Sequence, residues 1–139
     1  MKNYFTIKEL CASDTARLYK IDNTPSAEIE KHLTELITFL NPLREAWGSA
    51  ITVNSGYRCE KLNQKVGGSQ TSAHLLGYAV DLYPGNNKFE EFKVFVKNYL
   101  VNKNFDQCII EKSGHAQWIH LGLFNNKHAQ RKMTFNITK

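Results

Sequence analysis

The fold of this chain turns on residues 72–85, which read SAHLLGYAVDLYPG. Ala79–Leu82 is a short, mainly apolar run that predicts a β-strand, and the strand is expected to end before Pro84-Gly85. Gly77 precedes the strand, and a glycine permits the chain reversal that would bring His74 and Asp81 to one point. The segment therefore predicts a strand that begins beside two polar side chains able to act together.

A hairpin is predicted further along the chain, with strands at residues 106–111 and 118–124. In the second strand, the alternation of side chains places Trp118 and His120 on one face and Ile119 on the other, toward the core. The imidazole of His120 is therefore expected to face a site rather than the core.

Helical patterns account for most of the remaining apolar residues. Thr6–Glu9 has the spacing of a capping box and is expected to open a short helix. A longer helix follows the turn-rich residues 22–26 and ends near Gly48, and Asn87 is expected to cap another helix. The inward faces of the two long helices are predicted to carry Ile29, Leu33, Leu36, Ile37, Leu40, Leu43, Phe89, Phe92, Val96 and Leu100.

These elements, with a further short strand at Ile51–Val53, predict an α+β fold. We expect helices packed on one face of a small, largely antiparallel sheet, with the candidate site on its open face. A length of 139 residues suits one compact unit, so residues 1–139 are expected to form a single domain.

Two segments have no clear pattern of secondary structure. Residues 55–77 are rich in Gly, Ser, Asn and Gln, and a loop of this length in a small domain is often functional. We interpret it as a loop that forms the site. Residues 127–139 are basic and weakly patterned, and we interpret them as a solubilising terminus.

Composition limits the classes of partner. Hydrophobic residues make up 42% and charged residues 22% of the chain, which is ordinary for a globular protein. The net charge of +5 favours polyanions such as nucleic acid, anionic membranes or the acidic polymers of a bacterial wall. We expect no nucleic-acid partner, because no signature of a nucleic-acid-binding motif accompanies the charge. No apolar run approaches the ~20 residues of a membrane span, so no membrane insertion is expected.

The cysteines and the N-terminus bear on the cellular compartment. Cys11, Cys59 and Cys108 are odd in number and widely spaced, which favours reduced thiols over a disulfide framework. No apolar run follows Lys2, so we expect synthesis in the cytoplasm without a signal peptide. Nothing in the sequence indicates an obligate oligomer, and a monomer is expected.

His74, Asp81 and His120 together offer two imidazoles and a carboxylate. A catalytic zinc ion can use such a set while leaving one position for water. The alternative is that both histidines are surface or hydrogen-bonded residues and that Asp81 caps a turn.

Several motifs resemble those of one enzyme family. They are Ser55-Gly56-Tyr57-Arg58, Leu62-Asn63, Ser72-x-His74-x-x-Gly77-x-Ala79-x-Asp81, Phe105-Asp106-Gln107 with Glu111, and Trp118-x-His120. This combination resembles the zinc D-alanyl-D-alanine carboxypeptidase family of peptidoglycan peptidases (metallopeptidase family fifteen, subfamily A), in its short bacterial and phage branch. The resemblance implies a zinc ion held by His74, Asp81 and His120, and hydrolysis of peptide bonds in peptidoglycan stem peptides.

The resemblance also implies roles for supporting groups. Arg58 is expected to contact the substrate or the developing oxyanion, and Ser72 to bind substrate or orient a ligand. Several relatives place an acidic general base three residues before the last histidine ligand, where this chain has Gln117. Glu111 is our candidate for the base, provided that it pairs opposite Trp118, and His115 is the reserve.

These observations predict a zinc metallopeptidase, either a D,D-carboxypeptidase or an endopeptidase, active in cell-wall remodelling or in phage lysis. Without an export signal, the enzyme would reach the wall only if released, which fits a phage or prophage origin. The alternative, favoured by Gln117, is a catalytically inactive cell-wall-binding module that retains the same fold.

Overall fold

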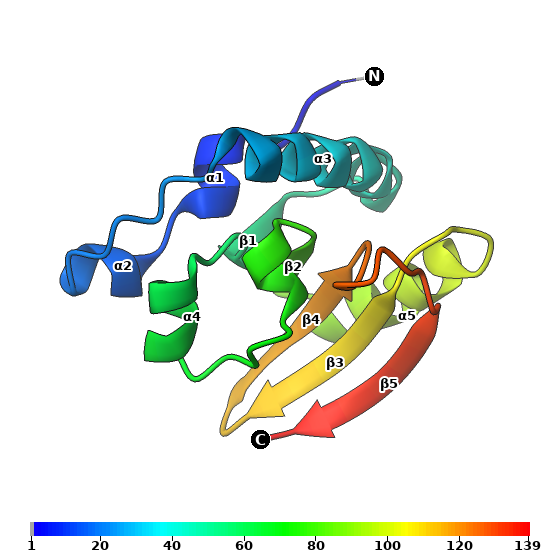
Figure 1. Cartoon of the computed structure of the whole chain (residues 1–139). Helices are drawn as coiled ribbons and strands as arrows, with labels where there is room; N and C mark the ends of the chain where they lie inside the picture. The colour runs from blue at the N-terminus through cyan, green and yellow to red at the C-terminus, as the bar shows by residue number, and fades with distance from the viewer. Residues whose placement is uncertain (1) are drawn as a thin grey trace.

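The computed structural model describes residues 2–139, and its chain begins with helices and ends in a strand at the edge of the sheet (Figure 1). The helical elements are α1 (Ile7–Cys11), α2 (Asp14–Leu18), α3 (Ala27–Trp47), α4 (Glu60–Lys65), the 3-10 helix η1 (Ala73–Leu76) and α5 (Phe89–Leu100). The strands are β1 (Ile51–Ser55), β2 (Ala79–Pro84), β3 (Gln107–Ser113), β4 (Ala116–Gly122) and β5 (Met133–Thr138).

The strands form one sheet in the order β1-β2-β4-β3-β5. All neighbours are antiparallel except β3 and β5, which are parallel. The predicted hairpin is the β3–β4 pair, in which Glu111 lies opposite Trp118. The predicted α+β fold with a small, largely antiparallel sheet is therefore confirmed.

The core lies between the sheet and the two long helices. In Figure 1, α3 crosses above the sheet and α5 lies behind β3 and β4. Leu36 and Leu40 of α3 and Phe92 of α5 are fully buried, as are Val80 and Ile119 of the sheet. The opposite face of β3 and β5 is turned toward the viewer without a helix over it. One face of the sheet is thus left to form a site.

Two segments contain more structure than the sequence predicted. Residues 55–77 include the short helices α4 and η1. Residues 133–138 form β5, which pairs with β3, so the interpretation of this region as a solubilising terminus is wrong. Apolar and polar residues do alternate in β5, but both of its faces are mostly exposed, and its pairing partner is distant in sequence.

The predicted cap of α5 is also wrong. The N-cap position is Lys88, which makes no side-chain capping bond, and Asn87 has a left-handed φ of 62°. The Asn86 side chain instead accepts a hydrogen bond from the backbone N–H of Lys88 at 3.0 Å. Within residues 2–139, no helix combines the length and apolar character needed to cross a bilayer.

Candidate metal centre

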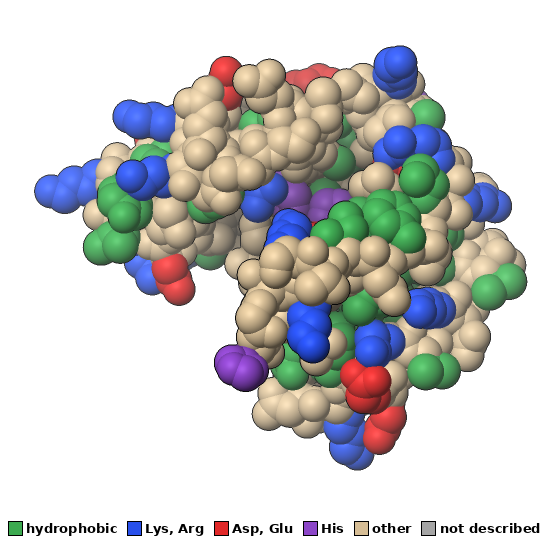
Figure 2. Space-filling model, turned by 90° about the horizontal axis from the view of Figure 1, so that it is seen from below, with side chains coloured by type: hydrophobic (Ala, Val, Ile, Leu, Met, Phe, Trp, Pro, Cys, Tyr) green, Lys and Arg blue, Asp and Glu red, His purple; other side chains and the backbone are tan. Residues whose placement is uncertain are grey.

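Three side chains from three elements meet in a cleft on the open face of the sheet. His74 comes from η1, Asp81 from β2 and His120 from β4, and one ligand atom from each lies within 4.8 Å of the other two. Asp81 Oδ1 is 3.3 Å from His74 Nε2 and 3.2 Å from His120 Nδ1. Figure 2 shows histidine side chains deep in a hollow with cationic side chains beside them. The structure brings together all three residues that the sequence proposed as metal ligands.

Local backbone structure explains this meeting point. Ser72 caps η1 by accepting a hydrogen bond from the His74 backbone N–H at 3.1 Å. Gly77 ends η1 with a φ of 76°, a left-handed value that glycine adopts without a Cβ clash, and the chain then turns into β2. Asp81 lies directly opposite His120 in the β2–β4 register. Because Asp81 lies within a strand, the alternative in which it caps a turn is wrong.

A backbone carbonyl orients the first imidazole. His74 Nδ1 lies 2.7 Å from the Gly56 carbonyl oxygen, which can only accept a hydrogen bond, so Nδ1 carries the proton. The lone pair of Nε2 is then directed toward Asp81. This is how a partner of one ring nitrogen fixes the tautomer of a metal-ligating histidine.

The electrostatics of the cluster suit a cation. Burial lowers the pKa of His74, although Asp81 acts in the opposite direction, so the imidazole is held in the neutral form that binds metals. Burial alone would raise the pKa of Asp81, but His74 and His120 hold it well below its usual range. Two neutral imidazole nitrogens and a carboxylate oxygen are ligands that zinc accepts in catalytic sites. The donor set therefore fits a zinc ion.

Gly56 permits a close approach that the orientation of His74 requires. A Cβ at this position would lie 2.1 Å from the Leu10 carbonyl oxygen. We expect Gly56→Ala to destabilise the fold by about 1–3 kcal/mol through overpacking and to weaken zinc affinity by about 10–100-fold through displacement of the Gly56 carbonyl. Denaturant unfolding and zinc titration measure the two effects.

Gly67→Ala is the matched control for this prediction. A Cβ at Gly67 would meet nothing within 4 Å, so the substitution causes no overpacking. Because Gly67 has a left-handed φ of 76°, alanine there should lower the free energy of unfolding by about 1 kcal/mol through backbone strain. Wild-type zinc affinity in Gly56→Ala would contradict the role of the carbonyl.

Glu111 lies beside the cluster on the same face of the sheet. Its side chain is buried, and its Oε1 atom is 4.0 Å from His120 Nδ1 and accepts a hydrogen bond from Trp118 Nε1 at 3.3 Å. Lys139 Nζ is 2.8 Å from the other oxygen, Oε2. One carboxylate oxygen of Glu111 is therefore held near the three candidate ligands.

The other two residues discussed for the base lie elsewhere. His115 is exposed in the turn between β3 and β4, away from the residues that line the cleft. Gln117 pairs with Lys112, and the alternation of side chains places it on the face opposite Trp118 and His120. The structure thus favours Glu111 over His115 as the candidate base.

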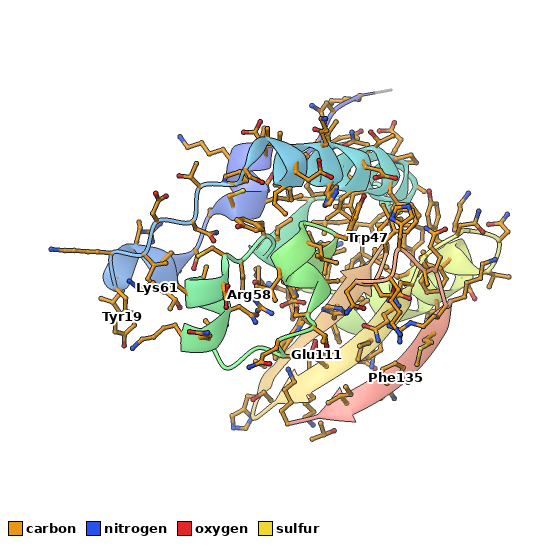
Figure 3. The ribbon with its side chains drawn as sticks, in the orientation of Figure 1. Tyr19, Trp47, Arg58, Lys61, Glu111 and Phe135 are labelled. Carbon is orange, nitrogen blue, oxygen red and sulfur yellow. The ribbon has the colours of Figure 1, made fainter. Side chains whose placement is uncertain are left out.

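Arg58 enters the cleft from the side of α4, whereas Glu111 enters from β3 (Figure 3). Burial lowers the pKa of Arg58, and the negative charges of Asp81 and Glu111 act in the opposite direction. Arg58 Nη2 donates a weak hydrogen bond to Ser72 Oγ at 3.5 Å. Ser72 therefore contacts both the candidate substrate-binding arginine and the backbone of His74.

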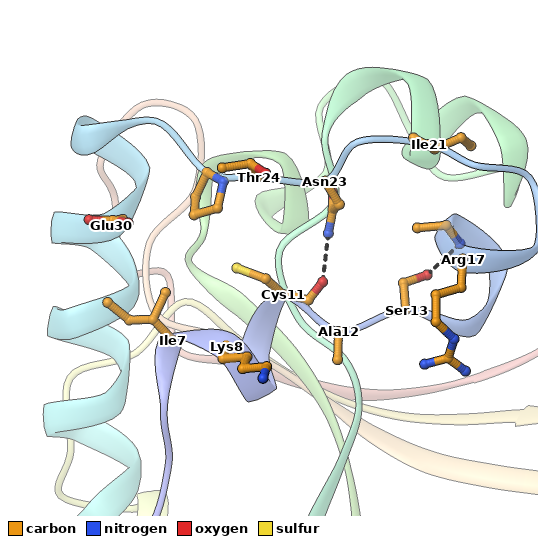
Figure 4. Close-up of a pocket in the computed structure, with 12 residues that line it drawn as sticks. Ile7, Lys8, Cys11, Ala12, Ser13, Arg17, Ile21, Asn23, Thr24 and Glu30 are labelled. Atoms are coloured by element: carbon orange, nitrogen blue, oxygen red, sulfur yellow. Dashed lines mark hydrogen bonds between the residues drawn. The ribbon is translucent and has the colours of Figure 1, made fainter.

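Asn23 holds the loop that carries Arg58, a role that the sequence did not indicate. Its side-chain Nδ2 donates to the Tyr57 carbonyl at 2.9 Å, and its Oδ1 accepts from the Cys59 backbone N–H at 2.7 Å. Asn23 also donates to the Cys11 carbonyl at 2.9 Å, at the edge of a separate cavity of about 510 Å³ (Figure 4). In the sequence, Asn23 lies in a turn-rich stretch, which suggests a polar side chain that bonds to backbone groups. Its partners could not be identified, because Tyr57 and Cys59 are distant in sequence.

The cleft has a volume of about 620 Å³ and is lined from several elements. Its charged and imidazole-bearing lining residues are Arg58, His74, Asp81, Asp106, Glu111, His120, Arg131 and Lys139. A cleft of this size can hold a short peptide segment.

Comparisons with known proteins agree with this geometry. The family model for peptidase M15 matches residues 3–122. The zinc D-Ala-D-Ala carboxypeptidase of Streptomyces albus G is 43% identical to this chain over 51 residues, which cover 36% of this chain and only 20% of that protein. The family match spans most of the chain and confirms the resemblance drawn from the sequence motifs. The chain belongs to the peptidase M15 family.

Proposed function

We propose that this chain is a zinc-dependent peptidase that hydrolyses peptide bonds in peptidoglycan stem peptides. The observation that carries the proposal is the His74–Asp81–His120 cluster, set in a cleft with Glu111 and Arg58 beside it. Membership of a peptidase family and similarity to a zinc D-Ala-D-Ala carboxypeptidase support it. We also propose that residues 1–139 act as a single domain and, since nothing in the sequence indicates an obligate oligomer, as a monomer.

The proposed metal ligands are His74 Nε2, an Asp81 carboxylate oxygen and His120 Nδ1. When bound, zinc lowers the pKa of its water ligand to about 7 and polarises a peptide carbonyl. Burial of His74 favours its neutral form, and the neighbouring imidazoles favour the ionised form of Asp81, as such an ion requires.

Glu111 is the proposed general base. Lys139 pairs with Oε2, which leaves Oε1 as the oxygen nearer His120. Oε1 would accept the proton of the attacking water and deliver it to the leaving amine. Trp118 holds the carboxylate in place through its hydrogen bond to Oε1.

Arg58 is proposed to stabilise the negative charge that develops on the scissile carbonyl oxygen. We expect Arg58→Ala to lower kcat/KM by about 10²–10³-fold, as measured for other oxyanion donors, while zinc remains bound. Steady-state kinetics and the metal content of the purified variant check this. Arg17→Ala, which removes an exposed arginine of α2, is the matched control and should behave as wild type. Wild-type kinetics in Arg58→Ala would remove this residue from the site.

The experiment that tests the proposed function is mass spectrometry of purified muropeptides incubated with the zinc-loaded protein, with and without a strong chelator. Chelator-sensitive loss of a terminal D-alanine would identify a D,D-carboxypeptidase. A chelator-sensitive internal cut would identify an endopeptidase and would favour a role in lysis over remodelling. A folded, zinc-loaded protein that yields no product from several wall types would instead indicate an inactive wall-binding module.

A further inference from the structure

The C-terminal part of the chain builds one wall of the cleft. The family match ends at residue 122, yet Asn125, Arg131 and Lys139 all line the cavity. Backbone hydrogen bonds from Lys132 to Phe105 and from Met133 to Asp106, at 3.0 and 2.9 Å, fix the start of β5 against the start of β3. The wall is therefore a fixed part of the fold.

The register of the sheet places the two cations of this wall on opposite sides of the metal cluster. His120 lies opposite Ile109, near the middle of β3. Arg131 contacts Asp106, just before β3 begins, whereas Lys139 pairs with Glu111, toward the far end of β3. A peptide bond placed over the cluster would thus have the candidate base on one side and Arg131 on the other.

The guanidinium of Arg131 is held by one of its edges. Nε donates to Asp106 Oδ1 at 2.8 Å and Nη2 donates to Oδ2 at 2.9 Å, and the Arg131 backbone N–H also donates to Oδ1 at 3.1 Å. Asp106 is 1% exposed, whereas the Arg131 side chain is 45% exposed. Within residues 2–139, the side-chain hydrogen bonds of Arg131 all go to Asp106, so the edge formed by Nη1 and the second Nη2 hydrogen is free. Such an edge is preorganised to receive a second carboxylate by two parallel hydrogen bonds.

The charge balance of the cleft favours an anionic ligand. Three cations, Arg58, Arg131 and Lys139, and three carboxylates, Asp81, Asp106 and Glu111, line it. With neutral histidines these charges cancel, so a bound divalent ion leaves the cleft with an excess of positive charge. A substrate that carries a carboxylate near its scissile bond would offset that excess.

We infer that Arg131 is a specificity-determining residue that binds a carboxylate of the peptide substrate, on the side of the metal cluster away from Glu111. This inference rests on the proposed peptidase function. The carboxylate can be the C-terminus of the peptide or that of an acidic residue within the stem, and both present the same planar pair of oxygens to the guanidinium.

The test uses the zinc-loaded full chain and three synthetic stem pentapeptides. One has all its carboxylates free, one has an amidated C-terminus, and one has an amidated acidic residue. We expect wild type to prefer the free acid over one of the amides by about 10–100-fold in kcat/KM, the size of a charge-assisted hydrogen-bond pair, and mainly through KM. The amide that is disfavoured identifies which carboxylate binds.

Variants assign this preference to Arg131. Arg131→Gln should lose the preference, and Arg131→Lys should lose most of it, because a lysine keeps the charge but cannot form two parallel hydrogen bonds to a carboxylate. Lys132→Ala, a change at the adjacent exposed residue, should keep the wild-type preference. Thermal unfolding of each variant reports any loss of fold.

Three results would overturn the inference: no preference in wild type, an unchanged preference in both Arg131 variants, or an equal loss toward acid and amide. The last would make Arg131 a structural tie for β5. Calorimetric binding of the same three peptides gives the comparison without turnover. A protein that cleaves none of them but binds the free acid through Arg131 would contradict the proposed function and support this inference.

Discussion

Replacing His120 by alanine is expected to abolish both zinc retention and turnover while the domain remains folded. The variant loses one of the two imidazoles of the cluster, and the ion with it. The imidazole faces the cleft, whereas its strand neighbours Ile119 and Leu121 hold β4 in the core, so the truncation removes little core packing. Loss of the ion removes several kcal/mol of transition-state stabilisation, so kcat/KM should fall by at least about 10³-fold.

Zinc content after dialysis, circular dichroism and peptide turnover measure these three outcomes. His115→Ala is the matched control, because it removes an exposed imidazole from the turn of the same hairpin. That variant should keep its zinc and its activity. Full zinc occupancy and normal turnover in His120→Ala would refute the proposed metal centre.

Replacing Glu111 by glutamine is expected to leave zinc bound and to lower kcat by ~10²–10⁴-fold, the usual contribution of a general base. Glutamine has nearly the same shape and can still accept the hydrogen bond from Trp118, but it cannot take up a proton at neutral pH. The loss should appear in kcat more than in KM, since proton transfer belongs to the chemical step.

Steady-state kinetics with parallel zinc analysis separates this effect from loss of the metal. Glu60→Gln, at an exposed carboxylate in the first turn of α4, serves as the control and should be neutral. A wild-type kcat in Glu111→Gln would exclude Glu111 as the base. Loss of activity in His115→Ala would then return the role to the reserve candidate.

Sequence patterns predicted the helices and strands in which apolar residues recur at a regular spacing. The apolar spacing of α3 and α5 and the alternation in β4 each reflect burial of one face, so they could be read without tertiary information. The choice of Glu111 as the candidate base depended on its pairing opposite Trp118, and the structure has that pairing. The three candidate ligands could be named from their residue types, and the resemblance of the combined motifs to one family strengthened the assignment, since the spacing alone is only moderately specific.

The parts that could not be predicted depend on contacts between distant segments. β5 buries little of either face, and only its parallel pairing with β3 makes it a strand. Nothing in the sequence indicates which groups Asn23 and Asp106 contact. Their roles depend on tertiary contacts: Asn23 bonds to the Tyr57 carbonyl, and Asp106 bonds to the Arg131 guanidinium. Helix α4 is one short segment in a polar stretch, and its N-cap interaction comes from the thiol of Cys59 rather than from a more usual capping residue.

The pairing of Asp81 opposite His120 gives two of the candidate metal ligands a support that Arg131 lacks. Both ligands stand on a ladder of backbone hydrogen bonds, which is insensitive to the identity of neighbouring side chains. Arg131 instead lies before β5, and its guanidinium is held by the side chain of one residue, Asp106. Substitutions at or near Arg131 can therefore change the choice of peptide while the proposed metal ligands keep their positions. Under the proposed function, the preference for one peptide over another can evolve separately from the metal site.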